Sequence, residues 1–261
     1  MRYICSKSFA NGTVYLLETD DGYPVEVTDT FLPIYTRDAI SRRQNSLESG
    51  EFGSRADRWM IGVSTMSGCP VGCKFCATGK LDKWRRLTAE EIIAQVQFVI
   101  EKNPSYSFVN AGEHKINYTR MGEPFLNISA VREAIDAIDS SFPSTHHYVS
   151  TIGIRNSNYG WISENVTLQL SLHALTDIRR DELIPFNGKL PICELGKIRT
   201  ESALKTTLNL TIVGRDDFDI KVLKKHFDPK FFFVKISPIN PNDVSSENGL
   251  GDGVVNGINL I

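Results

Sequence analysis

A chain of 261 residues with 41% hydrophobic and 23% charged residues has the composition of an ordinary globular protein. This length suits one large domain or two smaller ones. Every apolar run is shorter than the roughly 18–20 residues of a membrane span, and the start lacks a secretion signal, so we expect a cytoplasmic protein without membrane contact. A net charge of −2 argues against gripping nucleic acid over the whole surface, but it allows a local basic groove.

The first expected element is a β-hairpin. Two strand-like runs, 13–17 and 24–32, flank an Asp-Asp-Gly turn at 20–22. Residues 36–58, with five arginines and four acidic residues in little pattern, predict a linker. The sequence therefore divides into an N-terminal hairpin and linker (1–58), a main domain (59–241) and a glycine-rich C-terminal tail (242–261).

From residue 59 onward, short apolar strands alternate with amphipathic helical stretches. This alternation predicts an α/β fold with parallel strands and right-handed crossovers. The expected strands are 59–64, 115–119, 146–151, 167–172, 206–213 and 231–237. The expected helices are 88–102, 129–139, 192–204 and 217–227.

The five cysteines are Cys5, Cys69, Cys73, Cys76 and Cys193. An odd number without an export signal argues for a reducing compartment rather than a disulfide framework. Three of them fall within eight residues, directly after the apolar strand expected at 59–64. The carboxyl end of such a strand is where active sites of α/β folds assemble.

The three clustered thiols predict a metal site. Structural zinc usually takes four protein ligands, and neither a second cysteine pair nor a histidine at finger spacing follows. Three thiolates on one loop suit a [4Fe–4S] cluster with one iron left open to another ligand. Zinc and a bystander role remain the alternatives.

The Cys-x₃-Cys-x₂-Cys motif, with Phe75 before its last cysteine, is the signature of the radical S-adenosylmethionine (SAM) superfamily. Gly68-Cys-Pro-Val-Gly-Cys-Lys-Phe-Cys-Ala-Thr-Gly79 closely resembles one branch, the RlmN/Cfr-like RNA adenine methyltransferases. Further segments resemble the same branch in the same order: 87–96, 121–127 (Met-Gly-Glu-Pro-Phe-Leu-Asn), 150–153, 170–174, 180–185 and 237–241. The resemblance implies a partial (β/α)₆ barrel, which agrees with the six expected strands.

The resemblance also implies cofactors and their ligands. Cys69, Cys73 and Cys76 would hold a [4Fe–4S] cluster whose electron, supplied by a donor such as flavodoxin or ferredoxin, cleaves SAM to a 5′-deoxyadenosyl radical. A carboxylate can bind the methionine ammonium group, and hydroxyl or imidazole groups can bind its carboxylate or the ribose. The residues expected to contact SAM at the carboxyl edge of the barrel are Phe75, Gly122, Glu123, Ser150, Ser171, His173 and Asn240.

Other residues carry weaker signals. Glu26 lies in the hairpin where the family has a glutamate implicated in substrate deprotonation, so it is a weak catalytic candidate. Arg120 stands where the family usually has glycine. The basic turn with Trp84 predicts a substrate groove or a solvated surface with equal weight.

Two further interpretations favour structural roles. The pair His146–His147 is expected to be exposed before the third strand of the main domain. The run Phe231-Phe-Phe233 is expected to be a core strand rather than a base-stacking platform.

The methyltransferases use two additional thiols. One lies seven residues before the first cluster cysteine, where this chain has Gly62, and no cysteine follows Cys193. We therefore favour a radical SAM enzyme that abstracts hydrogen from an unidentified substrate, with RNA or a nucleotide-like molecule as candidates. An RNA adenine methyltransferase represented by a shortened chain is the first alternative. A non-catalytic iron–sulfur or zinc protein is the second.

Overall fold

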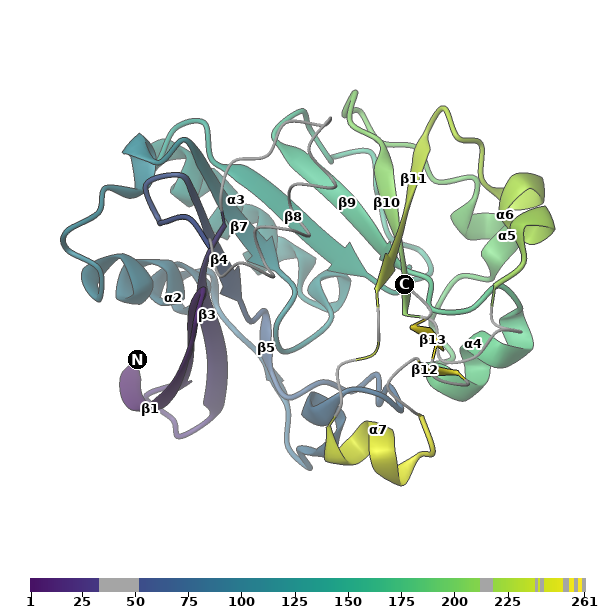
Figure 1. Ribbon diagram of the computed structural model, residues 1–261, viewed down its shortest axis with the longest axis horizontal. Coiled ribbons are helices and arrows are strands. Elements are labelled where there is room, and N and C mark those ends of the chain that lie inside the picture. The colour runs from purple at the N-terminus through teal and green to yellow at the C-terminus, as the bar shows by residue number, and fades with distance from the viewer. Residues whose placement is uncertain are drawn as a thin grey trace. The chain divides into compact units, whose positions relative to one another are not determined.

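The computed structural model describes residues 1–32, 52–211, 218–237, 239 and 242–250, together with the backbone of 254–255 and 258–259. The linker expected at 36–58 thus lies largely outside the described residues. The main sheet has the order β1-β2-β3-β4-β7-β8-β9-β10-β11 (Figure 1). Its strands are β1 (Arg2–Phe9), β2 (Gly12–Glu18), β3 (Pro24–Leu32), β4 (Arg58–Val63), β7 (Glu113–Tyr118), β8 (His146–Thr151), β9 (Val166–Ser171), β10 (Thr206–Thr211) and β11 (Phe232–Ser237).

Strand directions confirm the α/β prediction. β4 pairs with β7 in parallel, and β10 pairs in parallel with both β9 and β11. β2 and β3 form the expected antiparallel hairpin, and β3 continues antiparallel onto β4. Sequence reasoning missed β1, whose residues are all exposed and therefore show no alternating pattern.

The helices are α2 (Ala89–Glu101), α3 (Ile128–Ser141), α4 (Asp177–Leu183), α5 (Ile192–Leu195), α6 (Ile220–His226) and α7 (Asp243–Glu247). Short 3-10 turns are η2 (Ala77–Lys80), η3 (Phe108–Asn110) and η4 (Pro124–Leu126), and the short strands are β5 (Met66–Ser67), β6 (Arg85–Arg86), β12 (Val254–Val255) and β13 (Ile258–Asn259). In the described part of the chain, none of these helices is both long and apolar enough to cross a membrane.

The chain divides into two compact units. The first comprises 1–67, 86–121 and 127–148, and the second comprises 68–85, 122–126 and 149–261. β8 contributes residues to both units.

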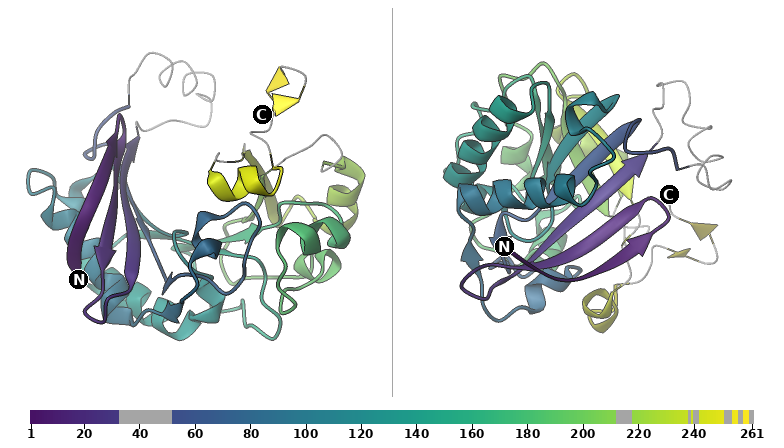
Figure 2. Two further views of the ribbon diagram at one scale, coloured as in Figure 1. Left: turned by 90° about the horizontal axis from the view of Figure 1, so that it is seen from below. Right: turned by 90° about the vertical axis from the view of Figure 1, so that its left-hand side faces the viewer.

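Two helices cover one face of the strands in the first unit. α2 and α3 pack side by side, and α2 also packs on β3 and β4 (Figure 2). α2 begins at Thr88, whose side chain accepts from the Glu91 N–H while the Glu91 carboxylate accepts from the Thr88 N–H. This reciprocal capping satisfies two donors that the first helical turn leaves unpaired.

A buried carboxylate joins the hairpin to the first strand of the main domain. Asp29 on β3 is fully buried and accepts hydrogen bonds from Arg55, from Trp59 Nε1 and from Asn103 Nδ2. A buried charge is tolerated only when it is paired and hydrogen-bonded, and these partners meet that need. Asp29 thus fixes the residues that lead into β4.

The expectation for His146–His147 was wrong for His147, which is fully buried. Its ring lies between the Tyr118 hydroxyl, 3.1 Å from Nδ1, and the Asp139 carboxylate, 2.9 Å from Nε2. The alternation of β8 turns residue 147 toward the helices, where α3 supplies Asp139. Because histidine is a polar residue type, the sequence analysis expected it at the surface and missed the buried hydrogen-bonded network that it forms.

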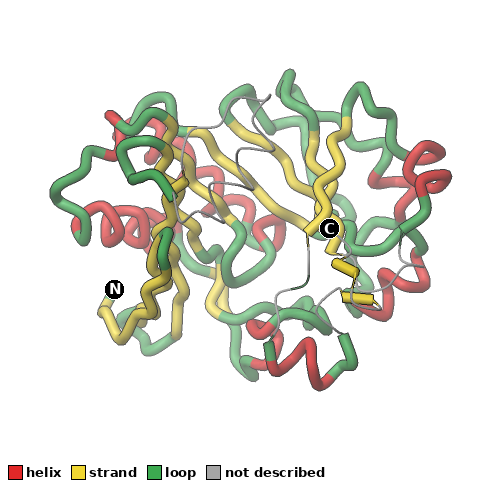
Figure 3. The backbone as a smooth tube through the Cα atoms, in the orientation of Figure 1, coloured by secondary structure: helices red, strands yellow, loops and turns green. Residues whose placement is uncertain are grey.

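The second unit differs from the expectation after β9. The helix expected at 192–204 is only α5, which ends at Leu195 with Gly196 as its C-cap. The close approach of the His226 carbonyl leaves no room for a Cβ at Gly196. The sequence analysis also did not predict α4, whose N-cap is Thr176. Figure 3 shows how much of this unit consists of loops between short elements.

The core interpretation of Phe231-Phe-Phe233 was correct only for Phe232, which is buried and packs on Phe227 of α6. Phe231 and Phe233 are exposed. In the described sheet β11 stands last in the strand order, and β10 is the strand it pairs with.

Candidate functional site

The cysteine loop belongs to the second unit. Gly68 and Gly72 both adopt φ of 69°, a left-handed backbone that favours glycine, and they fold the loop around Cys69 and Cys73. The Lys74 N–H donates to the Leu183 carbonyl at the end of α4. Side chains from α7 and its N-cap complete the support, since Asn242 donates to the Phe75 carbonyl and Asn248 to the Lys74 carbonyl.

The thiols share one electrostatic environment. Burial raises the pKa of Cys69 to about 12, with the neighbouring Cys76 and Glu123 adding to the rise. Burial also raises the pKa of Cys73 well above its usual value, and the other two cysteines and Glu123 act in the same direction. These couplings place the three sulfur atoms and the Glu123 carboxylate in one neighbourhood.

Glu123 follows Gly122, which has a φ of 102°, and is 4% exposed. One carboxylate oxygen accepts from the Phe125 N–H at 3.1 Å, and the other accepts from the Ile152 N–H at 2.9 Å. Burial raises the pKa of Glu123 to about 7, against the lowering effect of its hydrogen bonds. Glu123 therefore ties the loop after β7 to the loop after β8 and is not a solvated loop acid.

His173 connects the cysteine loop to β10. Its ring packs edge-on against Phe75, with centroids 4.8 Å apart, and its Nδ1 accepts from the Thr211 N–H at 3.2 Å. Burial lowers the pKa of His173 to about 4, so the ring is neutral and Nε2 carries its proton. Its backbone has a φ of 56°, unusual for a residue other than glycine. The site thus contains a hydrogen-bond donor with a fixed tautomer.

Ser150 and Ser171 lie on neighbouring strands with their hydroxyl groups 3.3 Å apart. Both are part-exposed residues of β8 and β9, near the carboxyl ends of these strands. Two adjacent hydroxyl groups can each donate and accept, which suits a carboxylate or a ribose. The remaining expected SAM contact, Asn240, lies outside the described residues.

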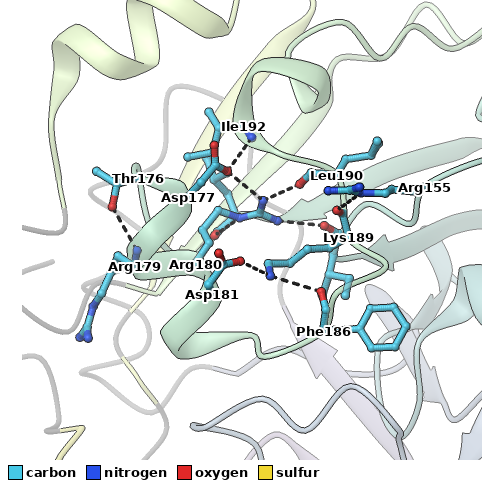
Figure 4. Close-up of polar contacts among 12 residues, drawn as sticks. Arg155, Thr176, Asp177, Arg179, Arg180, Asp181, Phe186, Lys189, Leu190 and Ile192 are labelled. Carbon is cyan, nitrogen blue, oxygen red and sulfur yellow. Dashed lines mark hydrogen bonds and ion pairs between the residues drawn. The ribbon is translucent and has the colours of Figure 1, made fainter.

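A buried arginine holds the strand ends in this unit. Arg180 is fully buried, and its guanidinium donates to the carbonyls of Leu172, Leu190 and Ile152 at 3.2, 2.8 and 3.0 Å (Figure 4). Leu172 and Ile152 follow the last residues of β9 and β8. Arg180 thus fixes the backbone beside His173 and beside the Glu123 anchor, a role that its motif did not reveal.

In the first unit, Glu26 and Arg120 form an ion pair at the edge where β4 and β7 end. Arg120 follows β7 and donates its N–H to the Val63 carbonyl, and its side chain passes over Gly62 toward Glu26. A Cβ at position 62 would overlap the Thr28 hydroxyl and lie 3.1 Å from Arg120 Cδ. The sequence showed Glu26, Gly62 and Arg120 as separate signals, and the structure brings them together.

The donor set at the cysteine loop fits an iron–sulfur cluster. Thiolates are the ligands that such clusters take, and all five cysteines of the chain carry free thiols. Among the described residues, no group of three or more His, Cys, Asp or Glu side chains is already arranged as a metal site. Cys69, Cys73 and Cys76 are the residues that would hold the cluster, and deprotonation would accompany binding.

Fold and site together define an α/β protein with a cysteine loop beyond a parallel strand, and comparison with known proteins specifies the family. The radical SAM superfamily matches residues 63–219, which is more than half of the chain. The chain therefore belongs to the radical SAM superfamily, a family of enzymes whose cofactors are a [4Fe–4S] cluster and SAM.

Two similar curated proteins, both named probable dual-specificity RNA methyltransferase RlmN, illustrate the likeness. The Petrotoga mobilis protein is 28% identical over 249 residues, 90% of this chain and 63% of the relative. The Thermosipho melanesiensis protein is 39% identical over 195 residues, 69% of this chain and 56% of the relative. The chain thus spans less than two thirds of these relatives.

A solved structure supports the fold. The crystal structure of a radical SAM methyltransferase from Sphaerobacter thermophilus aligns with a TM-score of 0.65 and 24% identity. The match covers 92% of this chain and 67% of that chain.

Proposed function

We propose that this chain binds SAM beside the cluster held by Cys69, Cys73 and Cys76, and abstracts hydrogen from a bound substrate without methyl transfer through protein thiols. A [4Fe–4S] cluster held by these cysteines would, once reduced, supply the electron for the cleavage of SAM to methionine and a 5′-deoxyadenosyl radical. We further propose a donor such as flavodoxin or ferredoxin for that electron, and a cytoplasmic location.

Different residues of the chain would bind different groups of SAM. Ser150, Ser171 and the Nε2–H of His173 would orient the carboxylate or ribose of SAM. Gly122 would allow close approach of the backbone, and Phe75 would pack against the cofactor. Glu123 would contribute through the loops that it anchors, or through the methionine ammonium group.

The observation that carries the proposal is the packing around Gly62. The resemblance places a thiol of the methyltransferases at this position, yet here the Thr28 hydroxyl and the Arg120 side chain take up the space that a Cβ would need. Glu26, the family's candidate for deprotonation, is paired with that same Arg120. Gly62 and the pairing of Glu26 both concern positions that the resemblance assigns to the handling of substrate, and the motif of the cysteine loop is unchanged.

SAM labelled in its methyl group tests the proposal. The anaerobically reconstituted protein, given a reductant, should form 5′-deoxyadenosine and leave the label on SAM or methionine. Label on adenine in RNA would contradict the proposal and establish the alternative, RNA adenine methylation, which the names of the relatives favour. Label on Cys193 would also contradict it.

A further inference from the structure

One face of the strands β9 and β10 in the second unit is polar and partly exposed. The opposite face of these strands is apolar and buried, with Leu168, Leu170, Leu208 and Leu210. β10 lies between β9 and β11, and the pairing of the three strands shows which residues lie side by side (Figure 1). We call this side the polar face, and it carries Gln169 and Ser171 of β9, Thr207 and Asn209 of β10, and Phe233 and Lys235 of β11.

Two amide side chains meet on the polar face. Asn209 Nδ2 donates to Gln169 Oε1 at 3.2 Å. In the part of the chain that the structure describes, this is the one hydrogen bond that either side chain makes. An amide group has two N–H donors and an oxygen with two lone pairs. The pair therefore keeps two unused groups, the donor Gln169 Nε2 and the acceptor Asn209 Oδ1, and partly buried polar groups of this kind need a partner.

The amide pair adjoins the residues that we expect to bind SAM. Ser171 follows Gln169 on β9 by two positions and lies opposite Asn209 on β10. Its hydroxyl group is 3.3 Å from that of Ser150, and the Asn209 carbonyl accepts from the His173 N–H. All of these residues belong to the second unit. A molecule held by the amide pair would thus lie beside the proposed SAM site, where hydrogen abstraction requires its substrate.

The charge of the polar face limits what it can bind. Lys235, opposite Asn209, is the one charged residue among the six that define this face. A polyanion needs many cations, because each phosphate contact adds to its affinity, so the polar face suits a ligand with a single negative group. Phe233, opposite Thr207, is 58% exposed and offers apolar surface for a side chain of the ligand.

The unused donor and acceptor of the amide pair match the backbone of an extended peptide. A residue in extended conformation presents its N–H and its C=O to the same side, which is how it exchanges two hydrogen bonds with a neighbouring strand.

We propose that the polar face binds the extended carboxyl end of a peptide as the substrate of the radical reaction. The C=O of one peptide residue would accept from Gln169 Nε2, and its N–H would donate to Asn209 Oδ1. The terminal carboxylate would pair with Lys235, and an apolar side chain would pack on Phe233. This proposal rests on the proposed function, since it supplies the substrate of that reaction.

Saturation-transfer NMR titrations test the amide pair with N-acetyl-alanyl-phenylalanine as the probe. The reconstituted protein is saturated with SAM and given no reductant, so that no reaction takes place. The depsipeptide in which an ester oxygen replaces the alanine N–H should bind about tenfold more weakly, because Asn209 Oδ1 then lacks its donor. Asn209→Leu should bind the peptide about tenfold more weakly than the wild type does, and it should no longer distinguish the peptide from the depsipeptide.

A third probe and a matched variant serve as controls. The wild type and Asn209→Leu should both bind the free acid about threefold more tightly than its C-terminal amide, because both keep Lys235. This shared preference shows that the polar face of the variant is folded. Lys235→Gln should lose the preference. Gln97→Leu, which removes an exposed amide of α2, should bind all three probes as the wild type does.

Three outcomes would overturn the proposal: no saturation transfer from the wild type at about 10 mM peptide, equal binding of the peptide and the depsipeptide by the wild type, or displacement of the peptide by adenosine 5′-monophosphate that binds more tightly. The titrations require no cleavage of SAM. A failure of the peptide site is therefore distinguishable from a failure of the proposed reaction, which the labelled-SAM experiment tests separately.

Discussion

The cysteine loop in the second unit and the Glu26–Arg120 edge in the first unit differ in how they relate to the RlmN/Cfr-like pattern. Around the cysteine loop, the motif residues Glu123 and His173 are held by backbone hydrogen bonds and by contact with the loop. Around the Glu26–Arg120 pair, Gly62 and Arg120 depart from the pattern together and pack on each other. The residues around the cysteine loop thus keep the family's pattern, whereas those around Gly62 depart from it.

The largest expected effect concerns the cysteine loop. Cys73→Ala should reduce iron and acid-labile sulfide from about four each per chain to almost none, because two thiolates cannot hold the cluster. Cys193→Ala, at an exposed position of α5, is the control and should keep full metal content. A tightly bound zinc without sulfide in the wild type would disprove the cluster.

The next effect concerns the arginine that holds the second unit together. Arg180→Gln should lower the free energy of unfolding by about 3 kcal/mol or more, because it leaves buried carbonyls of three residues without their donor. Arg179→Gln, at a neighbour whose side chain is 34% exposed, should change it by less than about 0.5 kcal/mol. Urea unfolding measures the free energy of unfolding of both variants. Equal values for the two variants would refute the role of Arg180 in holding the strand ends.

The packing around Gly62 in the first unit can be tested by substitution. Gly62→Ala should cost about 1–3 kcal/mol, since its Cβ would meet the Thr28 hydroxyl. If that contact is the cause, the double variant Gly62→Ala/Thr28→Ala should lose less than the sum of the two single variants. Gly79→Ala, with 3.5 Å to the nearest atom, is the control. Strict additivity would show that Thr28 does not crowd position 62.

The smallest effect is a pH dependence. The pKa of His173 is about 4 when folded, against 6.5 ordinarily, so the unfolded chain binds the proton more readily between these values. Stability should fall as the pH drops from about 6.5 to about 4. His173→Gln should flatten part of this decline, because burial also lowers the pKa of His146 to about 4. An unchanged decline in urea midpoints would contradict a lowered pKa of His173 in the folded chain.

The sequence predicted the six main strands and the cysteine loop because their signals are local. Apolar runs such as Trp59–Val63 and closely spaced thiols are visible without tertiary contacts. His147 and Arg180 are polar residues whose burial depends on distant partners, Asp139 and the carbonyl of Ile152. Such pairings cannot be read from neighbouring residues.

The contact of Gly62 and Glu26 with Arg120 could not be predicted from the sequence, for a related reason. Each residue could be seen to depart from or match a pattern, but their contact requires β3, β4 and the end of β7 to be adjacent. Phe231 and Phe233 were expected in the core but are exposed. An apolar run beside the last strand of the described sheet need not be covered by other residues.

The anchoring of Asp29 bears on how this protein tolerates changes in length. Leu32 and Arg58 are opposite each other in the β3–β4 ladder, and Asp29 fixes Arg55 and Trp59 beside them. The two ends of the intervening connection are thus held by the sheet itself. Because doubling the length of such a connection costs only about 0.6 kcal/mol in chain entropy, insertions, tags or reporter domains can be placed between β3 and β4 at little thermodynamic expense.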